Sequence, residues 1–186
     1  VTIPDSVTNI GGNAFTYCAG LTNFTVDATH PNYASTDGVL FNKALTLLIQ
    51  YPGGLAGNYA VPNGVTNIGG DAFYNCAGLT NLTVPGSLTD IGPGAFAYCF
   101  ALKSLALGNG VKSIGDRAFY NCFTLPSVAF PMADIDVSPD SAPCSPDNPP
   151  TSAVPKFSMR LSATQATSGM LMARSPTTAS PETARP

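Results

Sequence analysis

Few side chains in this sequence could carry out chemistry. It contains one histidine, His30, and one glutamate, Glu182, far apart in the chain. General acid–base or nucleophilic catalysis needs several reactive groups that converge on one point, and no Gly-x-Ser-x-Gly motif supplies a serine nucleophile. Because His30 precedes Pro31, we expect it in a surface loop. The sequence therefore predicts a protein that is not an enzyme and that needs no cofactor.

The cysteines are the other candidates for chemistry. Stacked side chains at one repeat position run parallel, whereas a disulfide needs its two Cβ–Sγ bonds turned toward each other. No histidine or second cysteine lies within a few residues to complete a zinc site. We expect buried free thiols that act as small apolar side chains, and no bound metal. Four of the five cysteines occupy one repeat position: Cys18, Cys76, Cys99 and Cys122.

Charge is sparse, at 10% Asp, Glu, Lys and Arg and a formal net charge of −3. No basic field exists to attract nucleic acid or an anionic membrane. Nothing approaches the roughly 20 uninterrupted apolar residues that cross a bilayer, so we expect neither a nucleic-acid partner nor membrane insertion. Four aspartates are predicted to form turns rather than to bind calcium: Asp5, Asp71, Asp90 and Asp116.

An internal repeat organises residues 1–130. The stretch Asp71–Leu79 has three further copies, at Asn13–Leu21, Gly94–Leu102 and Arg117–Leu125. Equivalent phenylalanines in the last three copies are 23 residues apart, whereas the first interval is 58 residues, which is 35 more than one repeat. A fixed period in the twenties indicates a stacked repeat array. One interior row is expected from the four phenylalanines Phe15, Phe73, Phe96 and Phe119.

The unit that begins at Leu79 predicts a coil with three sides. Apolar and polar residues alternate over Leu79–Val84, which predicts a strand that ends at Pro85. Leu88–Ile91 has room for a second extended segment, and Gly92 is expected to adopt a backbone conformation that a Cβ would penalise. Ala95–Cys99 has near-helical apolar spacing over about one turn. An isolated coil buries too little to fold, so stability must come from its neighbours.

The repeat resembles a known family. The pattern Leu-x-x-Leu-x-Val-Pro-x-x-Leu-x-x-Ile-Gly-x-x-Ala-Phe-x-x-Cys is similar to the BspA-type leucine-rich repeat, a class found mainly in bacterial, and some protist, cell-surface proteins. The resemblance implies a curved right-handed solenoid with a parallel sheet on the concave face, and short strands and single helical turns on the other sides. It also implies an extracellular or cell-surface location, a role in adhesion or binding, and no chemistry.

A 35-residue unit at about 27–61 departs from the repeat. Its segments Gly38–Phe41 and Thr46–Tyr51 flank Asn42–Leu45, which predicts a hairpin. Similar units interrupt other BspA-type arrays, where the resemblance implies two narrower coils. Two interpretations stay open. The unit is either a spacer that keeps the core continuous or a protruding specificity element that carries His30, Tyr33 and Tyr51.

Residues 131–186 have a different composition, with 10 of the 17 prolines. Pro131 falls where a strand-ending proline is due, but no Ile-Gly or Ala-Phe follows, so we expect the register to fail after Phe130. This Pro/Ser/Thr/Ala-rich tail is predicted to be disordered, or else to be a non-native, out-of-frame end. The last coil lacks a polar cap, which would allow end-to-end association. Val1–Pro4 matches Leu82–Pro85, so we expect a piece of a longer array or a mature form.

The outward strand positions predict a largely neutral, hydrogen-bonding surface. It is either a binding face for a protein or glycan ligand or the plain solvated face of a structural spacer. Binding hot spots favour Tyr, Trp and Arg, which this face lacks, so the affinity of one array should be weak. The predicted face consists of Thr22, Asn23, Thr25, Thr80, Asn81, Thr83, Lys103, Ser104 and Ala106. Two Asn-x-Thr sequons within it, at Asn23 and Asn81, are taken as products of the repeat pattern rather than as glycosylation sites.

Overall fold

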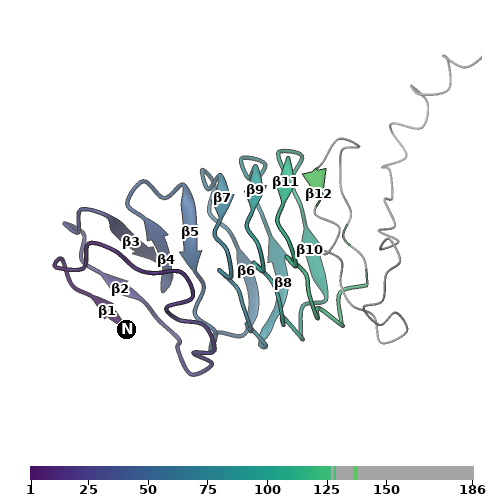
Figure 1. Cartoon of the computed structure of the whole chain (residues 1–186), viewed down its shortest axis with the longest axis horizontal. Coiled ribbons are helices and arrows are strands. Elements are labelled where there is room, and N and C mark those ends of the chain that lie inside the picture. The colour runs from purple at the N-terminus through teal and green to yellow at the C-terminus, as the bar shows by residue number, and fades with distance from the viewer. Residues whose placement is uncertain (127, 129–135, 138–186) are drawn as a thin grey trace, which may run out of the picture.

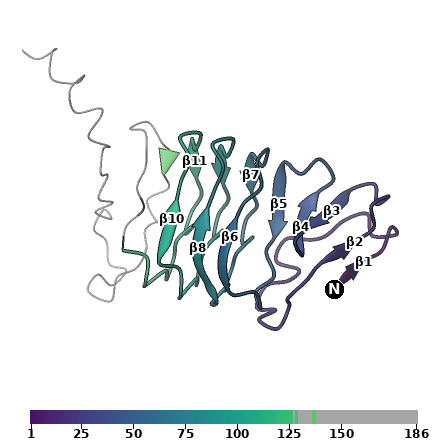
Figure 2. The ribbon, with the colours of Figure 1, turned by 180° about the vertical axis from the view of Figure 1, so that it is seen from behind.

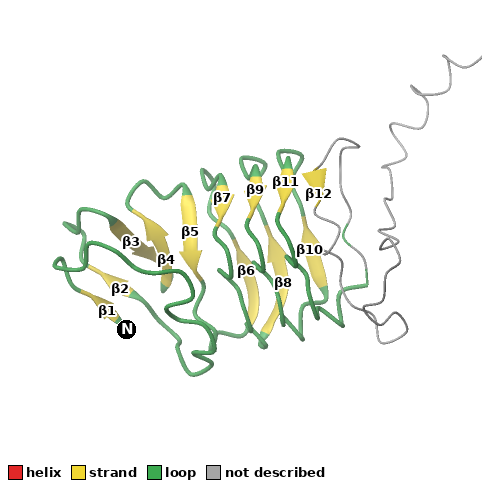
Figure 3. Cartoon of the chain, in the orientation of Figure 1, coloured by secondary structure: helices red, strands yellow, loops and turns green. Residues whose placement is uncertain are grey.

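The chain folds into an elongated stack of coils, a parallel-strand β-solenoid of about five turns (Figure 1). The computed structural model describes residues 1–126, 128, 136 and 137. Every regular element in these residues is a strand (Figure 3). No helix in this part of the chain is long and apolar enough to cross a membrane.

The first side of the coils carries the longer strands predicted from the alternating pattern. β6 (Gly57–Ala60), β8 (Leu79–Thr83) and β10 (Ser104–Ala106) form a parallel three-stranded sheet, and they lie side by side in Figure 2. In β8 the buried residues Leu79 and Leu82 alternate with the exposed Asn81 and Thr83. The prediction of this strand is confirmed.

Short strands form the second side, as the Leu-x-x-Ile spacing predicted. β7 (Asn67–Ile68), β9 (Asp90–Ile91), β11 (Ser113–Ile114) and β12 (Asp136–Val137) pair in parallel with a constant 23-residue register. Because β12 keeps this register, the expectation that the register fails after residue 130 is wrong for these two residues. The rest of the predicted disordered tail, at 131–135 and 138–186, lies outside the described residues.

The third side is built from tight turns, where single helical turns were expected. In one coil the Tyr74 N–H donates to the Asp71 carbonyl oxygen at 2.9 Å, and the Cys76 N–H donates to that of Phe73 at 3.1 Å. Asp71 and Asn75 have φ values of 55° and 56°. This left-handed backbone cannot continue an α-helix. The turns are instead joined from coil to coil, for example by the Phe73 N–H, which donates to the Ala95 carbonyl oxygen at 2.8 Å.

Gly92 is required for a different reason from the one predicted. Its φ does not lie in the left-handed region. A Cβ at Gly92 would instead lie 2.6 Å from the backbone nitrogen of Gly70 and 2.7 Å from the carbonyl carbon of Gly69 in the preceding coil. The glycine therefore permits close approach of two backbones.

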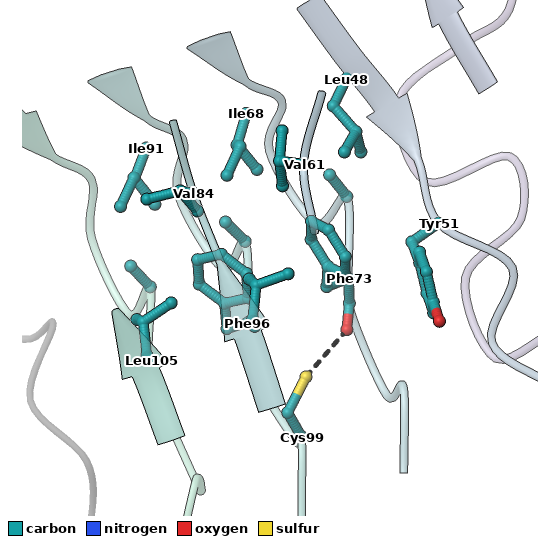
Figure 4. Packing of buried hydrophobic residues seen from close by; sticks show 14 of the residues in the cluster. Leu48, Tyr51, Val61, Ile68, Phe73, Val84, Ile91, Phe96, Cys99 and Leu105 are labelled. Carbon is teal, nitrogen blue, oxygen red and sulfur yellow. Dashed lines mark hydrogen bonds between the residues drawn. The ribbon is translucent and has the colours of Figure 1, made fainter. Parts of the chain in front are cut away.

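Three of the four repeat phenylalanines form the interior row. Phe73 and Phe96 stack with ring centroids 5.1 Å apart, and Phe96 and Phe119 stack at 5.4 Å. Tyr51 continues the row beyond Phe73 at 5.0 Å (Figure 4). The prediction that Phe15 belongs to this row is wrong. Its half-buried ring packs edge-on against Phe24 in a second, smaller core.

The 35-residue unit explains this division of the core. It forms β3 (Tyr33–Thr36), β4 (Val39–Asn42) and β5 (Leu47–Gln50), an antiparallel meander that confirms the predicted hairpin and adds one strand. Val39 and Phe41 pack into the main core, whereas Leu40 packs into the smaller one. Both faces of β4 are thus buried. The unit separates the interior into two clusters.

The same unit keeps the sheet continuous, because β5 pairs in parallel with β7 and extends the row of short strands. The interpretation that the unit is a spacer that keeps the core continuous is wrong for the core, because the buried residues on its two sides form two separate clusters. The alternative interpretation, a protruding specificity element, is wrong because the three residues that it would present are all buried: His30, Tyr33 and Tyr51.

Candidate binding surfaces

The predicted polar face is present on the three-stranded sheet. Asn81 of β8 pairs in register with Ser104 of β10 and with Asn58 of β6. The Asn81 Nδ2 group donates to Asn58 Oδ1 at 2.6 Å, and the Thr80 hydroxyl donates to the same oxygen at 3.0 Å. The face is exposed, but part of its hydrogen-bonding capacity is used between its own side chains. It also includes the exposed Thr83, Lys103 and Ala106.

The other predicted members of this face lie elsewhere. Thr22 and Asn23 precede β2 (Thr25–Val26), which pairs with β1 (Thr2–Ile3) in a separate two-stranded sheet. The Phe24 N–H donates to the carbonyl oxygen of Gly38 at 2.8 Å, so the turn between β3 and β4 adjoins this strand. The single ladder predicted from the repeat is therefore divided, because the 35-residue unit places its own turn beside β2.

Three of the four repeat cysteines are buried free thiols, as predicted. The Cys99 thiol donates to the Phe73 carbonyl oxygen at 3.1 Å (dashed line in Figure 4), and the Cys122 thiol donates to that of Phe96 at 3.0 Å. Burial raises the pKa of Cys76 to about 12. Burial likewise raises the pKa of Cys99. The Cys76 and Cys99 thiols therefore stay protonated at neutral pH, which makes them poor nucleophiles and metal ligands.

Cys18 departs from this pattern because it is exposed. Its coil packs against the narrow coil that follows Tyr51, where the Gly54 N–H donates to the Leu21 carbonyl oxygen at 2.7 Å. That narrow coil has no Ala-Phe turn to cover the thiol. The prediction that Cys18 points into the core is therefore wrong.

His30 is fully buried, which overturns its predicted place in a surface loop. Its Nδ1 accepts the backbone N–H groups of Asn32 and Tyr33, both at 3.1 Å. Its Nε2 is buried without a hydrogen-bond partner. A ring that is buried and whose Nδ1 already accepts two N–H groups holds the chain ahead of β3 and cannot reach a substrate.

The aspartates do not converge. Asp5, Asp71 and Asp116 lie in turns, as predicted, whereas Asp90 lies in β9. The pKa of Asp90 is lowered by hydrogen bonds from the hydroxyls of Ser113 at 2.5 Å and Thr89 at 2.6 Å. Nowhere in the described residues do three His, Cys, Asp or Glu side chains come together as a metal site.

The sequence reasoning missed one surface, a row of rings on the turn side of the coils. Tyr17 and Tyr74 lie 5.2 Å apart between ring centroids, Tyr74 and Tyr98 5.1 Å, and Tyr98 and Tyr120 5.6 Å. Phe100 contacts Tyr98 at 5.9 Å and Phe123 at 5.9 Å. We call these six residues the aromatic ridge. Three of them are prominent at the surface: Tyr17, Phe100 and Phe123, with 68%, 40% and 48% of their area exposed.

A signal for the ridge exists in the sequence. Each copy of the Ala-Phe-x-x-Cys turn has one tyrosine between its phenylalanine and its cysteine. The tyrosine is the first intervening residue in two copies and the second in the other two, and this shift hides the row from a simple alignment.

Solved structures similar to this chain include two bacterial proteins. A leucine rich cell surface protein from Faecalibacterium prausnitzii has 34% sequence identity and a TM-score of 0.69 over 76% of this chain and 38% of its own. The pneumococcal vaccine antigen PcpA has 30% identity and a TM-score of 0.67 over 73% of this chain and 34% of its own. This chain thus spans little more than a third of the length of either. No curated protein sequence matches it.

The repeat itself is matched by a described family. Six copies of the BspA type leucine rich repeat region align with residues 1–44 and 56–140. Proteins built from these repeats are generally not enzymes. The matched regions cover most of the chain and agree with its parallel-strand coils, and the chain therefore belongs to the BspA-type leucine-rich repeat family.

Proposed function

We propose that this chain is a non-enzymatic binding or adhesion module of a surface-associated protein, with a protein or a glycan as its ligand. The exposed, largely neutral outer face of β6, β8 and β10 carries the proposal. Amide and hydroxyl groups such as those of Asn81, Thr83 and Ser104 can donate to and accept from a polar ligand. The cell-surface relative from Faecalibacterium prausnitzii supports an extracellular location.

The absence of chemistry in the described residues agrees with a binding role. The buried histidine and thiols have no access to substrate, and the exposed face carries one charged side chain, Lys103. Neutral polar contacts are worth about 0.5–1.5 kcal/mol each. A face of this kind therefore gives weak single-site binding, which many coils could strengthen by avidity.

The face can be tested by adding bulk and charge at its centre. The variant Asn81→Arg/Thr83→Arg changes two outward side chains of β8 and leaves the inward Leu82 in place. Asn109→Arg, at an exposed corner, is the matched control. We expect the double variant to lose binding to an immobilised panel of matrix proteins and glycans, and the control to keep it. Equal binding by both would remove this face from consideration.

A second function, a structural spacer in a larger surface protein, is favoured by one observation. Asn58 Oδ1 already accepts hydrogen bonds from both Thr80 and Asn81, so the face is partly satisfied without a ligand. A spacer tolerates a change of length by one coil. Deleting residues 79–101 should then leave the parent protein's binding intact, whereas a binding role for this array predicts a loss.

A further inference from the structure

We propose that Tyr17 and Tyr74 form an oxidative cross-linking site, at which a one-electron oxidant of the peroxidase and hydrogen peroxide class joins the two rings as dityrosine. Their phenol oxygens are hydrogen-bonded at 2.8 Å, although 57 residues separate them in the chain. Their ring centroids lie 5.2 Å apart. The site differs from the polar strand face in position and chemistry, and it does not rest on the proposed binding role.

The geometry of the pair resembles that of the product. Dityrosine has a bond between one ortho carbon of each ring, so each phenol oxygen is carried by the carbon next to the new bond. The oxygens of Tyr17 and Tyr74 already meet, which places ortho carbons of the two rings near each other. The rings are inclined at 80°, and the rings of dityrosine are likewise twisted about the bond that joins them. Bond formation therefore requires a small approach of the two ring edges.

Exposure favours this pair over the other tyrosines. Tyr17 has 68% of its area exposed, whereas Tyr74, Tyr98 and Tyr120 are half-buried. An oxidant in solution therefore reaches Tyr17 first, and the phenol that is hydrogen-bonded to it belongs to Tyr74. The remaining tyrosines of the chain have a buried side chain or a buried phenol oxygen: Tyr33, Tyr51 and Tyr59.

The backbone gives an independent reason to assign a role to the Tyr17 ring. Tyr17 has a φ of 62°, in the left-handed region. The equivalent residues of two other turns are Asn75 and Asn121, with φ values of 56° and 58°. Asparagine adopts this conformation more readily than tyrosine. The first coil therefore keeps a ring where the turn alone favours asparagine, and that ring is the one that contacts Tyr74.

The reaction balances with the named oxidant. Each phenol O–H loses one hydrogen atom to the oxidant, and the two phenoxyl radicals couple through one ortho carbon of each ring. The hydrogens on these carbons then leave as protons and the two oxygens are protonated, which restores both phenols. Two tyrosines and one hydrogen peroxide thus give one dityrosine and two waters. The rings are oxidised and the peroxide is reduced.

The new bond would join the two parts of the divided core. Tyr17 follows Phe15, which packs against the smaller cluster, and Tyr74 follows Phe73 of the main cluster. In the described residues the smaller cluster has four buried members, far fewer than the main one. Coils are stabilised by their neighbours, so we expect the first coil to be the weaker part. A covalent link between distant positions stabilises a fold by restricting the unfolded chain.

The test treats the full chain with a plant haem peroxidase and hydrogen peroxide. A thiol reductant is added afterwards, because Cys18 is exposed and oxidation could also join it in a disulfide. We expect dityrosine fluorescence in a monomeric product whose mass is lower by two hydrogen atoms. Proteolysis and tandem mass spectrometry should then locate the link between Tyr17 and Tyr74. A product without dityrosine, or one linked through other residues, would overturn the proposal.

Three variants test the assignment to this pair. Tyr17→Phe and Tyr74→Phe each keep the ring and remove one phenol, so both should remain folded and lose most of the dityrosine. The matched control Tyr98→Phe/Tyr120→Phe removes two other phenols of the aromatic ridge and should keep the yield. Equal yields from Tyr17→Phe and the control would overturn the assignment.

Two measurements separate a link within one chain from a link between chains, and show what the link does. The yield of linked monomer should not change with protein concentration, and a product made only of linked dimers would overturn the assignment. The linked monomer should unfold at a higher urea concentration than the untreated protein, whereas treated Tyr17→Phe should show no such shift. Equal unfolding midpoints for linked and untreated protein would overturn the stabilising role.

Discussion

The phenol oxygens of Tyr17 and Tyr74 lie 2.8 Å apart, although 57 residues separate them in the chain. They meet because the narrow coil between their two coils has no Ala-Phe turn of its own. Tyr51 fills the interior position of that coil and stacks on Phe73 at 5.0 Å. The 35-residue unit therefore interrupts the sequence repeat without interrupting the aromatic ridge.

Because the backbone at Tyr98 is left-handed, we expect the variants Tyr98→Asn and Tyr74→Asn to differ in their loss of stability. Tyr98→Asn loses ring contacts worth about 0.5–1.5 kcal/mol each but relieves about 1–2 kcal/mol of backbone strain. Tyr74→Asn loses similar contacts, and Tyr74 has no positive φ to relieve. We expect Tyr74→Asn to be the more destabilising by about 1 kcal/mol. Urea unfolding of both variants checks this, and equal losses would show that the strain is not significant.

The interior row predicts which phenylalanine matters most. Phe96 is fully buried between Phe73 and Phe119, so Phe96→Ala should cost about 3–5 kcal/mol in unfolding free energy. Phe15 is only half-buried and lies outside the row, so Phe15→Ala should cost clearly less. Equilibrium unfolding monitored by circular dichroism gives both values. A larger loss for Phe15→Ala would contradict the division of the core.

Close coil packing predicts a similar contrast between two glycines. Gly92→Ala would place a Cβ 2.6 Å from the Gly70 nitrogen, and such overpacking costs about 1–3 kcal/mol or more. A Cβ at Gly86 meets nothing within 4 Å, and its φ is not left-handed. Gly86→Ala should therefore be neutral or slightly stabilising. Thermal unfolding of the two variants makes the comparison, and equal melting temperatures would refute the packing argument.

The buried thiols predict a loss of stability at alkaline pH. Burial raises the pKa of Cys76 from 9.0 to about 12. Above pH 9 the unfolded thiol ionises while the folded one keeps its proton, so the unfolded state is favoured as pH rises toward 12. Each such group adds up to about 1.4 kcal/mol per pH unit to this decline.

The variant Cys76→Ala tests this linkage. Its unfolding free energy should fall less steeply between pH 9 and 12 than that of the parent chain, measured by urea denaturation at several pH values. The other buried groups, such as Cys99 and Tyr51, whose pKa values are also raised by burial, remain in both proteins. Identical slopes for the two would mean that the Cys76 thiol ionises as readily when folded as when unfolded.

The sequence alone determined the repeat, its strands and most of its interior. Leu82 and Ile91 return in register because each coil can bury its apolar side chains only against the next coil. The regular period therefore predicts the two rows of parallel strands and the stacked Phe73, Phe96 and Phe119. A local pattern was sufficient for these features because each residue contacts its own equivalent in the neighbouring coil.

Only the tertiary structure decided what happens where the period breaks. Nothing in the repeat pattern shows that Tyr51 replaces a phenylalanine, that His30 is buried, that Cys18 is exposed, or that the polar face is divided beside Gly38. These outcomes depend on how a unit of 35 residues fits between coils of 23. The packing of an irregular unit is set by contacts between residues far apart in the chain, and a periodic sequence pattern carries no information about such contacts.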